Sequence, residues 1–235
     1  MKLTPQILRN ATRMINPEGK LTLLLRNLEL TYIENLELTT DDINVIDLTN
    51  NDIGELSGVP TLSNLEVLLL GNNNISSIDE NGSLPSLHSL SLINNNIRTF
   101  SELGKLRHFG QIQTLLMMGN PISTDKRYRP FLIWLLPSLK VLDCEKVKSA
   151  ERTAAATLFG ASFEEANALA LQLMNGEDTS VEVNKEASKG ERLMTTTVKK
   201  LSAEEKAKLI AELEKAESME EIERIQTALK NGYVG

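Results

Sequence analysis

A recurring order of apolar positions runs through the first half of the chain. Leucine, isoleucine or methionine fills the template LxxLxLxxNxL in four successive copies, each closed by one asparagine and one isoleucine. The four asparagines are spaced 22, 22 and 25 residues apart. A fixed period of roughly 20 to 30 residues predicts a stack of similar structural units. The copies are Ile43 to Ile53, Leu65 to Ile75, Leu87 to Ile97 and Ile112 to Ile122.

Each copy predicts one short strand followed by a turn. The two apolar residues of LxL point to the same side of a strand, so they enter the core while the residue between them faces outward. An asparagine in the turn can pair with backbone groups that have no ladder partner, which predicts a structural role for Asn51, Asn73, Asn95 and Asn120. The fold class is therefore α/β: a leucine-rich-repeat solenoid with a curved parallel β-sheet on its concave face and short helical or 3-10 turns on its convex face.

Helical caps are expected at both ends of the array. Residues 1–20 are predicted to form an N-terminal capping helix, which begins at Thr4-Pro5 and continues at helical spacing to Ile15. Residues 21–152 are predicted to form the leucine-rich-repeat domain with its C-terminal cap. The apolar segment from Pro130 to Pro137, which contains the single tryptophan Trp134, is interpreted as core.

Three further segments follow the repeats. Residues 153–176 are predicted to form a helical extension, in which Ser162 to Glu165 has the form of a capping box that opens a second helix. Residues 177–200 are polar and lack periodicity, which predicts a flexible linker. Residues 201–232 hold two more capping boxes and two apolar stripes, which predict a C-terminal helical hairpin.

The distribution of charge suggests where nucleic acid could bind. The net charge is −7, and residues 161–235 hold 15 acidic against 10 basic residues. An acidic protein repels phosphate backbones on average, so RNA contact needs a local basic region. Residues 126–152 provide one, with seven basic and three acidic side chains. The candidate RNA-backbone contacts are Lys126, Arg127, Lys146, Lys148 and Arg152.

The chain lacks the residue patterns of the common catalytic sites. It contains no GxxxxGK[ST], GxGxxG, HExxH, GxSxG or CxxC motif, so we expect no enzyme, catalytic residue, cofactor or metal site. Cys144 is the only cysteine, which favours a reducing compartment, and we expect it in the core. No run approaches 18 apolar residues, so no membrane association is expected.

The concave sheet is the large preformed surface of a solenoid, and its outward positions are the candidate partner site. Apolar side chains recur among them, and exposed apolar residues grouped on one face are typical of protein interaction sites. A helix would fit such a trough. The partner-binding candidates are Leu24, Arg26, Asn27, Asp47, Thr49, Leu69, Gly71, Asn72, Ser91, Ile93, Asn94, Leu116 and Met118.

Several segments outside the repeat leucines resemble one family. They are the opening MKLTPQIL, Tyr32 to Leu36, Lys126 to Arg129, and Val141 to Asp143 with the following Lys146 and Lys148. Over about residues 1–152 these segments resemble the A-prime family of U2 small nuclear ribonucleoprotein subunits, and residues 201–206 and 218–224 are similar to the C-terminal end of that family. The resemblance weakens after Arg152, where residues 153–165 hold no Lys or Arg.

The resemblance implies a non-enzymatic scaffold subunit that acts in the nucleus in pre-mRNA splicing. Its concave face would hold a helix of the RNA-recognition-motif (RRM) protein B-double-prime. The pair would bind a stem-loop of U2 small nuclear RNA and contact other spliceosomal proteins. The alternative is a regulatory leucine-rich-repeat adaptor of a phosphatase or of chromatin or cytoskeletal proteins.

Overall fold

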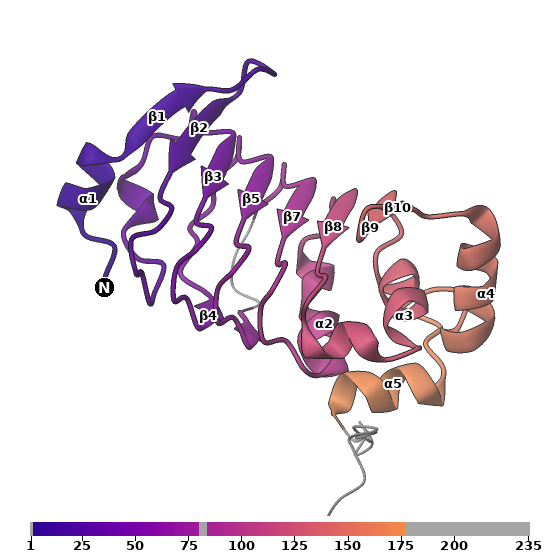
Figure 1. Ribbon diagram of the computed structural model, residues 1–235. Helices are drawn as coiled ribbons and strands as arrows, with labels where there is room; N and C mark the ends of the chain where they lie inside the picture. Colours follow the sequence, from indigo (N-terminus) through magenta and orange to yellow (C-terminus); the bar gives the residue numbers. More distant parts are fainter. Residues whose placement is uncertain (1, 80–83, 177–235) are drawn as a thin grey trace, which may run out of the picture. The chain divides into compact units, whose positions relative to one another are not determined.

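The computed structural model describes residues 2–79 and 84–176, all of which belong to one compact unit. Its centre is an eight-stranded sheet with the order β1-β2-β3-β5-β7-β8-β9-β10, in which the strands from β2 to β9 run parallel (Figure 1). The predicted linker (177–200) and hairpin (201–232) lie outside the described residues. The strands are β1 (Thr12–Ile15), β2 (Leu21–Leu24), β3 (Val45–Asp47), β5 (Val67–Leu69), β7 (Ser89–Ser91), β8 (Thr114–Leu116), β9 (Val141–Leu142) and β10 (Glu145–Lys146).

The repeat leucines form one continuous core behind this sheet. The central residue of each parallel strand from β2 to β8 is almost fully buried, and the register places these residues side by side from strand to strand. This confirms the predicted leucine-rich-repeat solenoid. The aligned central residues are Leu23, Ile46, Leu68, Leu90 and Leu115.

The repeat asparagines support the turns, as the sequence predicted. The side-chain amide nitrogen of Asn95 donates to the carbonyls of Leu70 and Leu92, and its oxygen accepts from the backbone N–H of Ile75. Asn95 is only 7% exposed, so without these bonds several buried backbone groups would lack partners. Asn51, Asn73 and Asn120 make equivalent bonds.

The convex side changes character along the array. In the central repeats it is extended, since β4 (Glu55–Leu56) and β6 (Ser77–Ile78) pair as a small parallel sheet. Helical turns occur towards the two ends, where the returning segments are longer or pack against a cap. They are η1 (Leu36–Leu38), α2 (Phe100–Lys105), η2 (Leu106–His108) and η3 (Pro121–Thr124).

The N-terminal cap is a short helix followed by a strand, so the prediction of one helix through Ile15 is wrong. Helix α1 (Pro5–Asn10) begins with the side chain of Thr4 accepting from the N–H of Ile7 and ends at extended Ala11. Strand β1 then pairs antiparallel with β2. This pairing gives hydrogen-bond partners to the backbone N–H and C=O groups on the outer edge of β2. A helix over residues 1–20 would have left those groups unpaired.

The C-terminal cap has an aromatic core. Helix α3 (Tyr128–Leu135) is almost entirely buried, which confirms the interpretation of the segment between the two prolines. The indole N–H of Trp134 donates to the carbonyl of Gly160 at 2.9 Å. The rings of Phe131 and Phe159 pack edge to face at 5.6 Å between centroids. Helix α4 (Ser149–Phe159) supplies Phe159 and closes the core.

Two local predictions at this end were wrong. The second helix of the extension, α5 (Ala168–Asn175), begins at the N-cap Asn167, because Ser162 to Glu165 form a tight turn beside left-handed Gly160. Cys144 is exposed rather than buried. It lies in the turn between β9 and β10, where Asp143 and Cys144 both have positive φ, as a type I′ hairpin turn requires.

Candidate functional site

The concave face consists of the strand residues that alternate with the buried ones. Because side chains of a strand point alternately to its two sides, the first and third residues of each three-residue strand face away from the core. The backbone ladder continues beyond the strands, since the N–H of Asn72 donates to the carbonyl of Ile93 and that of Asn94 to the carbonyl of Met118, both at 2.8 Å. Backbone hydrogen bonds between repeats therefore extend along the whole concave face.

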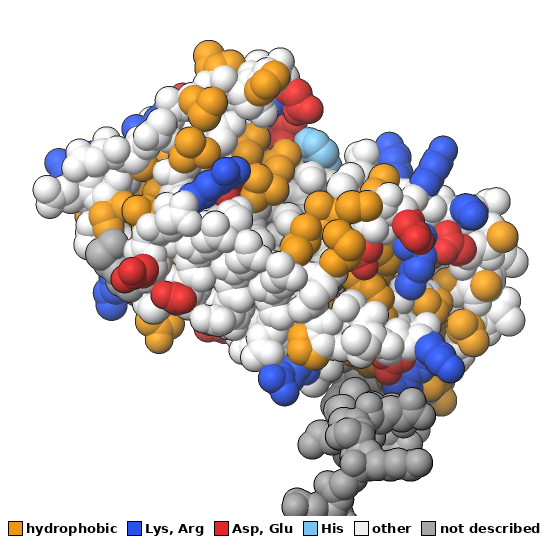
Figure 2. Space-filling model, viewed as in Figure 1, with side chains coloured by type: hydrophobic (Ala, Val, Ile, Leu, Met, Phe, Trp, Pro, Cys, Tyr) orange, Lys and Arg blue, Asp and Glu red, His pale blue; other side chains and the backbone are white. Residues whose placement is uncertain are grey.

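Apolar side chains are open to solvent on this face. Met118 is 39% exposed, and Leu69, Ile93 and Leu116 are partly exposed. Figure 2 shows hydrophobic side chains gathered over β3 and β5 and again over β8. A hollow of about 510 Å³ lies at the strand starts. It is lined by Asn16, Pro17, Glu18, Val45, Val67, Leu69, His88, Ser89 and Thr114.

An ion pair lies on the N-terminal part of the concave face. The Asp47 carboxylate is 1% exposed and accepts from the Arg26 guanidinium and from the N–H of Thr49. Burial disfavours its charged form, but the hydrogen bonds from Arg26 and Thr49 outweigh this effect and lower the pKa of Asp47. Arg26 itself keeps a half-exposed side chain.

Three of the predicted outward positions are buried. Asp47 is buried by the ion pair, and Ser91 is 7% exposed. Gly71 is also buried, because a side chain added there would reach the Cβ of Ile93 at 3.9 Å and the Oγ of Ser91 at 3.9 Å. These three buried residues lie at the base of the concave face, and the side chains of larger neighbouring residues project beyond them.

The asparagines at the strand ends form a hydrogen-bonded row. Asn27, Asn50, Asn72 and Asn94 all adopt left-handed backbone conformations, which asparagine tolerates better than other non-glycine residues. The amide nitrogen of Asn94 donates to Asn72 at 2.8 Å, and that of Asn72 donates to Asn50 at 2.7 Å. The exposed amides of this row border the apolar trough on the side of the strand ends.

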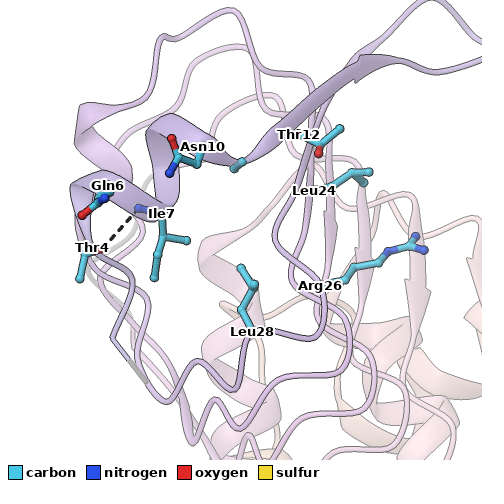
Figure 3. A pocket seen from close by; sticks show the side chains of 9 residues that line it. Thr4, Gln6, Ile7, Asn10, Thr12, Leu24, Arg26 and Leu28 are labelled. Carbon is cyan, nitrogen blue, oxygen red and sulfur yellow. Dashed lines mark hydrogen bonds between the residues drawn. The ribbon is translucent and has the colours of Figure 1, made fainter.

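A second hollow, of about 650 Å³, lies between α1 and the first parallel strand (Figure 3). Ile7, Leu24 and Leu28 form its apolar side, and Arg26 stands at its border with the rest of the concave face. The rest of the lining is Ala11 and four uncharged polar residues: Thr4, Gln6, Asn10 and Thr12. The candidates Leu24 and Arg26 therefore line this hollow, whereas Leu69 lines the hollow at the strand starts.

The basic candidates of the C-terminal cap divide into two groups. Arg127 forms an ion pair with Asp125 at 2.8 Å, and Arg152 donates to the carbonyl of Leu139, so both take part in the structure of the cap. Lys126, Lys146 and Lys148 are exposed. Lys146 is paired with Val141 in the β9–β10 hairpin, which places its side chain on the concave side at the end of the sheet.

Sequence reasoning missed the other half of the concave positions. Only the residue inside each LxL and the one after it were predicted to face outward. The residue before the first leucine of LxL has the same period-two orientation, which brings Thr22, Val45, Val67, Ser89 and Thr114 to this face. Strand β1 adds Thr12 and Met14 beside Leu24 and Thr22, and no repeat pattern indicated that strand.

Comparison with known proteins identifies the family. The chain matches the leucine-rich repeat family over residues 1–172. It is 47% identical to U2 small nuclear ribonucleoprotein A′ of Candida albicans and 46% identical to that of Debaryomyces hansenii, and both alignments cover 100% of each chain. The chain belongs to the U2 small nuclear ribonucleoprotein A′ family.

A solved structure of an A′ family member has the same fold. The match is to the crystal structure of the Drosophila melanogaster SNF/U2A′ complex, with a TM-score of 0.67 and 34% identity. It covers 75% of this chain and 99% of that chain. That A′ protein was thus crystallised with a protein partner.

Membership places the chain among the leucine-rich-repeat subunits of the U2 particle, which acts in pre-mRNA splicing. The relatives are named for a ribonucleoprotein subunit and not for an enzyme. Their names favour this role over the alternative of a phosphatase, chromatin or cytoskeletal adaptor. Within residues 2–79 and 84–176, no helix is long and apolar enough to cross a membrane.

Proposed function

We propose that the concave face binds one helix of the RRM protein B-double-prime of the U2 particle. The observation that carries this proposal is the row of partly exposed apolar side chains at Leu69, Ile93, Leu116 and Met118 along the parallel sheet. An amphipathic helix laid into an apolar trough buries such residues against its own apolar stripe. The SNF/U2A′ complex of a relative supports the pairing.

The polar borders of the trough would set the position of this helix. The row of Asn50, Asn72 and Asn94 lies along the strand ends, and the Arg26–Asp47 pair lies towards the N-terminal cap. Each offers hydrogen bonds that only a correctly placed partner satisfies. A partner that removed water from these groups without forming hydrogen bonds to them would bind less tightly, because burying an unpaired polar group costs free energy.

The complex of the two proteins, rather than this chain alone, would bind a stem-loop of U2 small nuclear RNA. Lys126, Lys146 and Lys148 are exposed in the C-terminal cap, and Lys146 stands at the end of the concave face where an RNA held by the partner would pass. Three lysines in an acidic chain favour assistance to a partner over tight independent binding. The complex would act in the nucleus and contact other spliceosomal proteins.

Calorimetric titration of the chain with recombinant B-double-prime protein tests the protein interface. Ile93→Glu places a charge where water is excluded, so we expect affinity to fall by about 30-fold, equivalent to about 2 kcal/mol. Leu38→Glu is the matched control, because Leu38 is 59% exposed in η1, outside the concave sheet. Equal binding by Ile93→Glu and the parent chain would show that the helix docks elsewhere.

A gel shift at physiological salt tests the RNA part separately. The isolated chain is expected to bind the stem-loop weakly, and addition of the chain to B-double-prime protein is expected to tighten binding of the stem-loop. Tight, sequence-selective binding by the isolated chain would contradict the proposed division of labour.

A further inference from the structure

The two edge strands of the large sheet differ in length, charge and exposure. At the C-terminal edge, β10 has only two residues, Glu145 and Lys146, and both are charged. Short, charged edges discourage the addition of another strand. At the N-terminal edge, β1 has four residues, all exposed, and stands at the end of the strand order (Figure 1). Ile15 of β1 is 71% exposed and Met14 is 46% exposed.

The register of the β1–β2 hairpin shows which backbone groups β1 leaves open. The N–H of Asn16, one residue beyond β1, donates to the carbonyl of Lys20 at 2.9 Å, so Asn16 is bonded across the hairpin. In an antiparallel pair, residues bonded to the neighbouring strand alternate with residues whose N–H and C=O point the other way. Met14 and Thr12 therefore bond to β2, and Arg13 and Ile15 turn their N–H and C=O groups to the open edge.

The side chains of β1 indicate what chemistry would pair with this edge. Arg13 and Ile15 are two residues apart and so share one face of the sheet, opposite the face of Met14. Arg13 is the only charged residue of β1. A strand that pairs here gains most from a carboxylate beside Arg13 and an apolar side chain beside Ile15, because cross-strand pairs of these kinds are stabilising.

We propose that β1 binds an extended segment of a partner protein, in which an acidic and an apolar residue stand two positions apart and so share one face, as a further strand of the large sheet. The segment would bond to the backbone of Arg13 and Ile15, and would cover the exposed side chain of Ile15. This site is independent of the helix-binding trough, since Arg13 and Ile15 face away from the concave side. The same chain can therefore hold two partners, or two segments of one partner.

The probes are two synthetic peptides of threonine that carry valine two positions away on each side of one charged residue, which is glutamate in the first peptide and lysine in the second. Each is titrated into the full chain labelled with nitrogen-15, and amide shifts and hydrogen exchange are followed by NMR. We expect the glutamate peptide to bind at least 10-fold more tightly, with slowed exchange at the Arg13 and Ile15 amides. Equal affinity for both peptides, or no binding of either, would overturn the proposal.

Ile15→Pro tests the strand pairing itself. Proline removes the N–H of Ile15, which does not bond to β2, so the hairpin is expected to persist and the chain to melt within a few degrees of the parent. Binding of the glutamate peptide should fall at least 10-fold, whereas Ile15→Val should retain it. Unchanged binding by a folded Ile15→Pro chain would contradict the pairing.

A charge reversal keeps the test decisive if Ile15→Pro does not fold. Arg13→Glu is expected to reverse the preference, so that the lysine peptide binds more tightly than the glutamate peptide. A preference that stays with the glutamate peptide would overturn the proposal. Ile93→Glu should leave peptide binding unchanged, and a loss there would show that the peptide occupies the concave trough instead.

Discussion

The concave face and the C-terminal cap offer partners two different kinds of surface. The concave face presents apolar side chains from parallel strands, and in its Arg26–Asp47 ion pair the carboxylate is buried while the Arg26 side chain stays half-exposed. The cap presents exposed lysines around an aromatic core that includes Phe131 and Phe159. A surface built from a repeated strand suits the burial of a helix, whereas exposed positive charges on a cap suit a phosphate backbone. Repetition produces the first surface, and the irregular end of the array produces the second.

The largest expected effect separates the two sides of the segment that directly follows β7. Leu92 is fully buried behind the sheet and Ile93 is partly exposed beside it. We expect Leu92→Glu to lower the free energy of unfolding by at least about 4 kcal/mol, because an unpaired charge enters the core. Ile93→Glu should lower it by less than about 1 kcal/mol. Urea denaturation of both variants measures the difference, and similar losses would mean that Ile93 belongs to the core.

A second variant tests whether the C-terminal cap can be destabilised without weakening partner binding to the concave face. Phe159 is fully buried and packs against Phe131 and Trp134. Phe159→Ala is expected to cost about 3 to 5 kcal/mol of stability, since it leaves a cavity in the aromatic core. The fluorescence of Trp134, the only tryptophan, reports the change directly. Affinity for B-double-prime protein should change less than 3-fold at a temperature where the variant is folded, and a larger loss would show that the two regions are coupled.

The Arg26–Asp47 ion pair on the concave side makes a pH-dependent contribution to the stability of the folded chain. Since the pKa of Asp47 is lowered in the folded chain, its stabilisation is fully present above its unfolded pKa of about 4 and is lost as the pH falls through the lowered value. We expect Asp47→Asn to cost about 2 kcal/mol at pH 7. The difference from the parent should shrink in denaturation curves recorded from pH 5 to pH 2. A difference that stays constant over this range would show that Asp47 is not an ion-pair partner.

The smallest effect concerns the lysines of the cap. In the complex with B-double-prime protein, replacing Lys146 and Lys148 by Gln should weaken stem-loop binding by about 1 kcal/mol or somewhat more. The slope of log affinity against log salt should fall by about 1 to 2. Replacing the exposed Lys2 of the N-terminal cap by Gln provides the control. An unchanged slope in the double variant would place the RNA away from these two residues.

The repeat template predicted the core and the parallel sheet because each repeat asparagine and leucine has one geometric role. Asn95, for example, has the bonds that its position implies. The ends were predicted less well, because no repetition constrains them. Residues 12–15 form a strand because they pair with the edge of β2. Asp47 can be buried because Arg26, from the preceding repeat, forms an ion pair with it. The β1–β2 partners are 6 to 12 residues apart and Arg26 is 21 residues from Asp47, so local patterns do not encode either contact.

Site-specific crosslinking within the assembled complex tests the central claim most directly. A photoreactive phenylalanine analogue is placed in turn at Leu69, Ile93 and Met118 on the concave face, and at Leu38 and Leu158 as exposed apolar controls. The proposed function predicts that the three concave positions crosslink to residues on one face of a single helix of B-double-prime protein and that the controls do not. Crosslinks from the controls, with none from the concave positions, would contradict it.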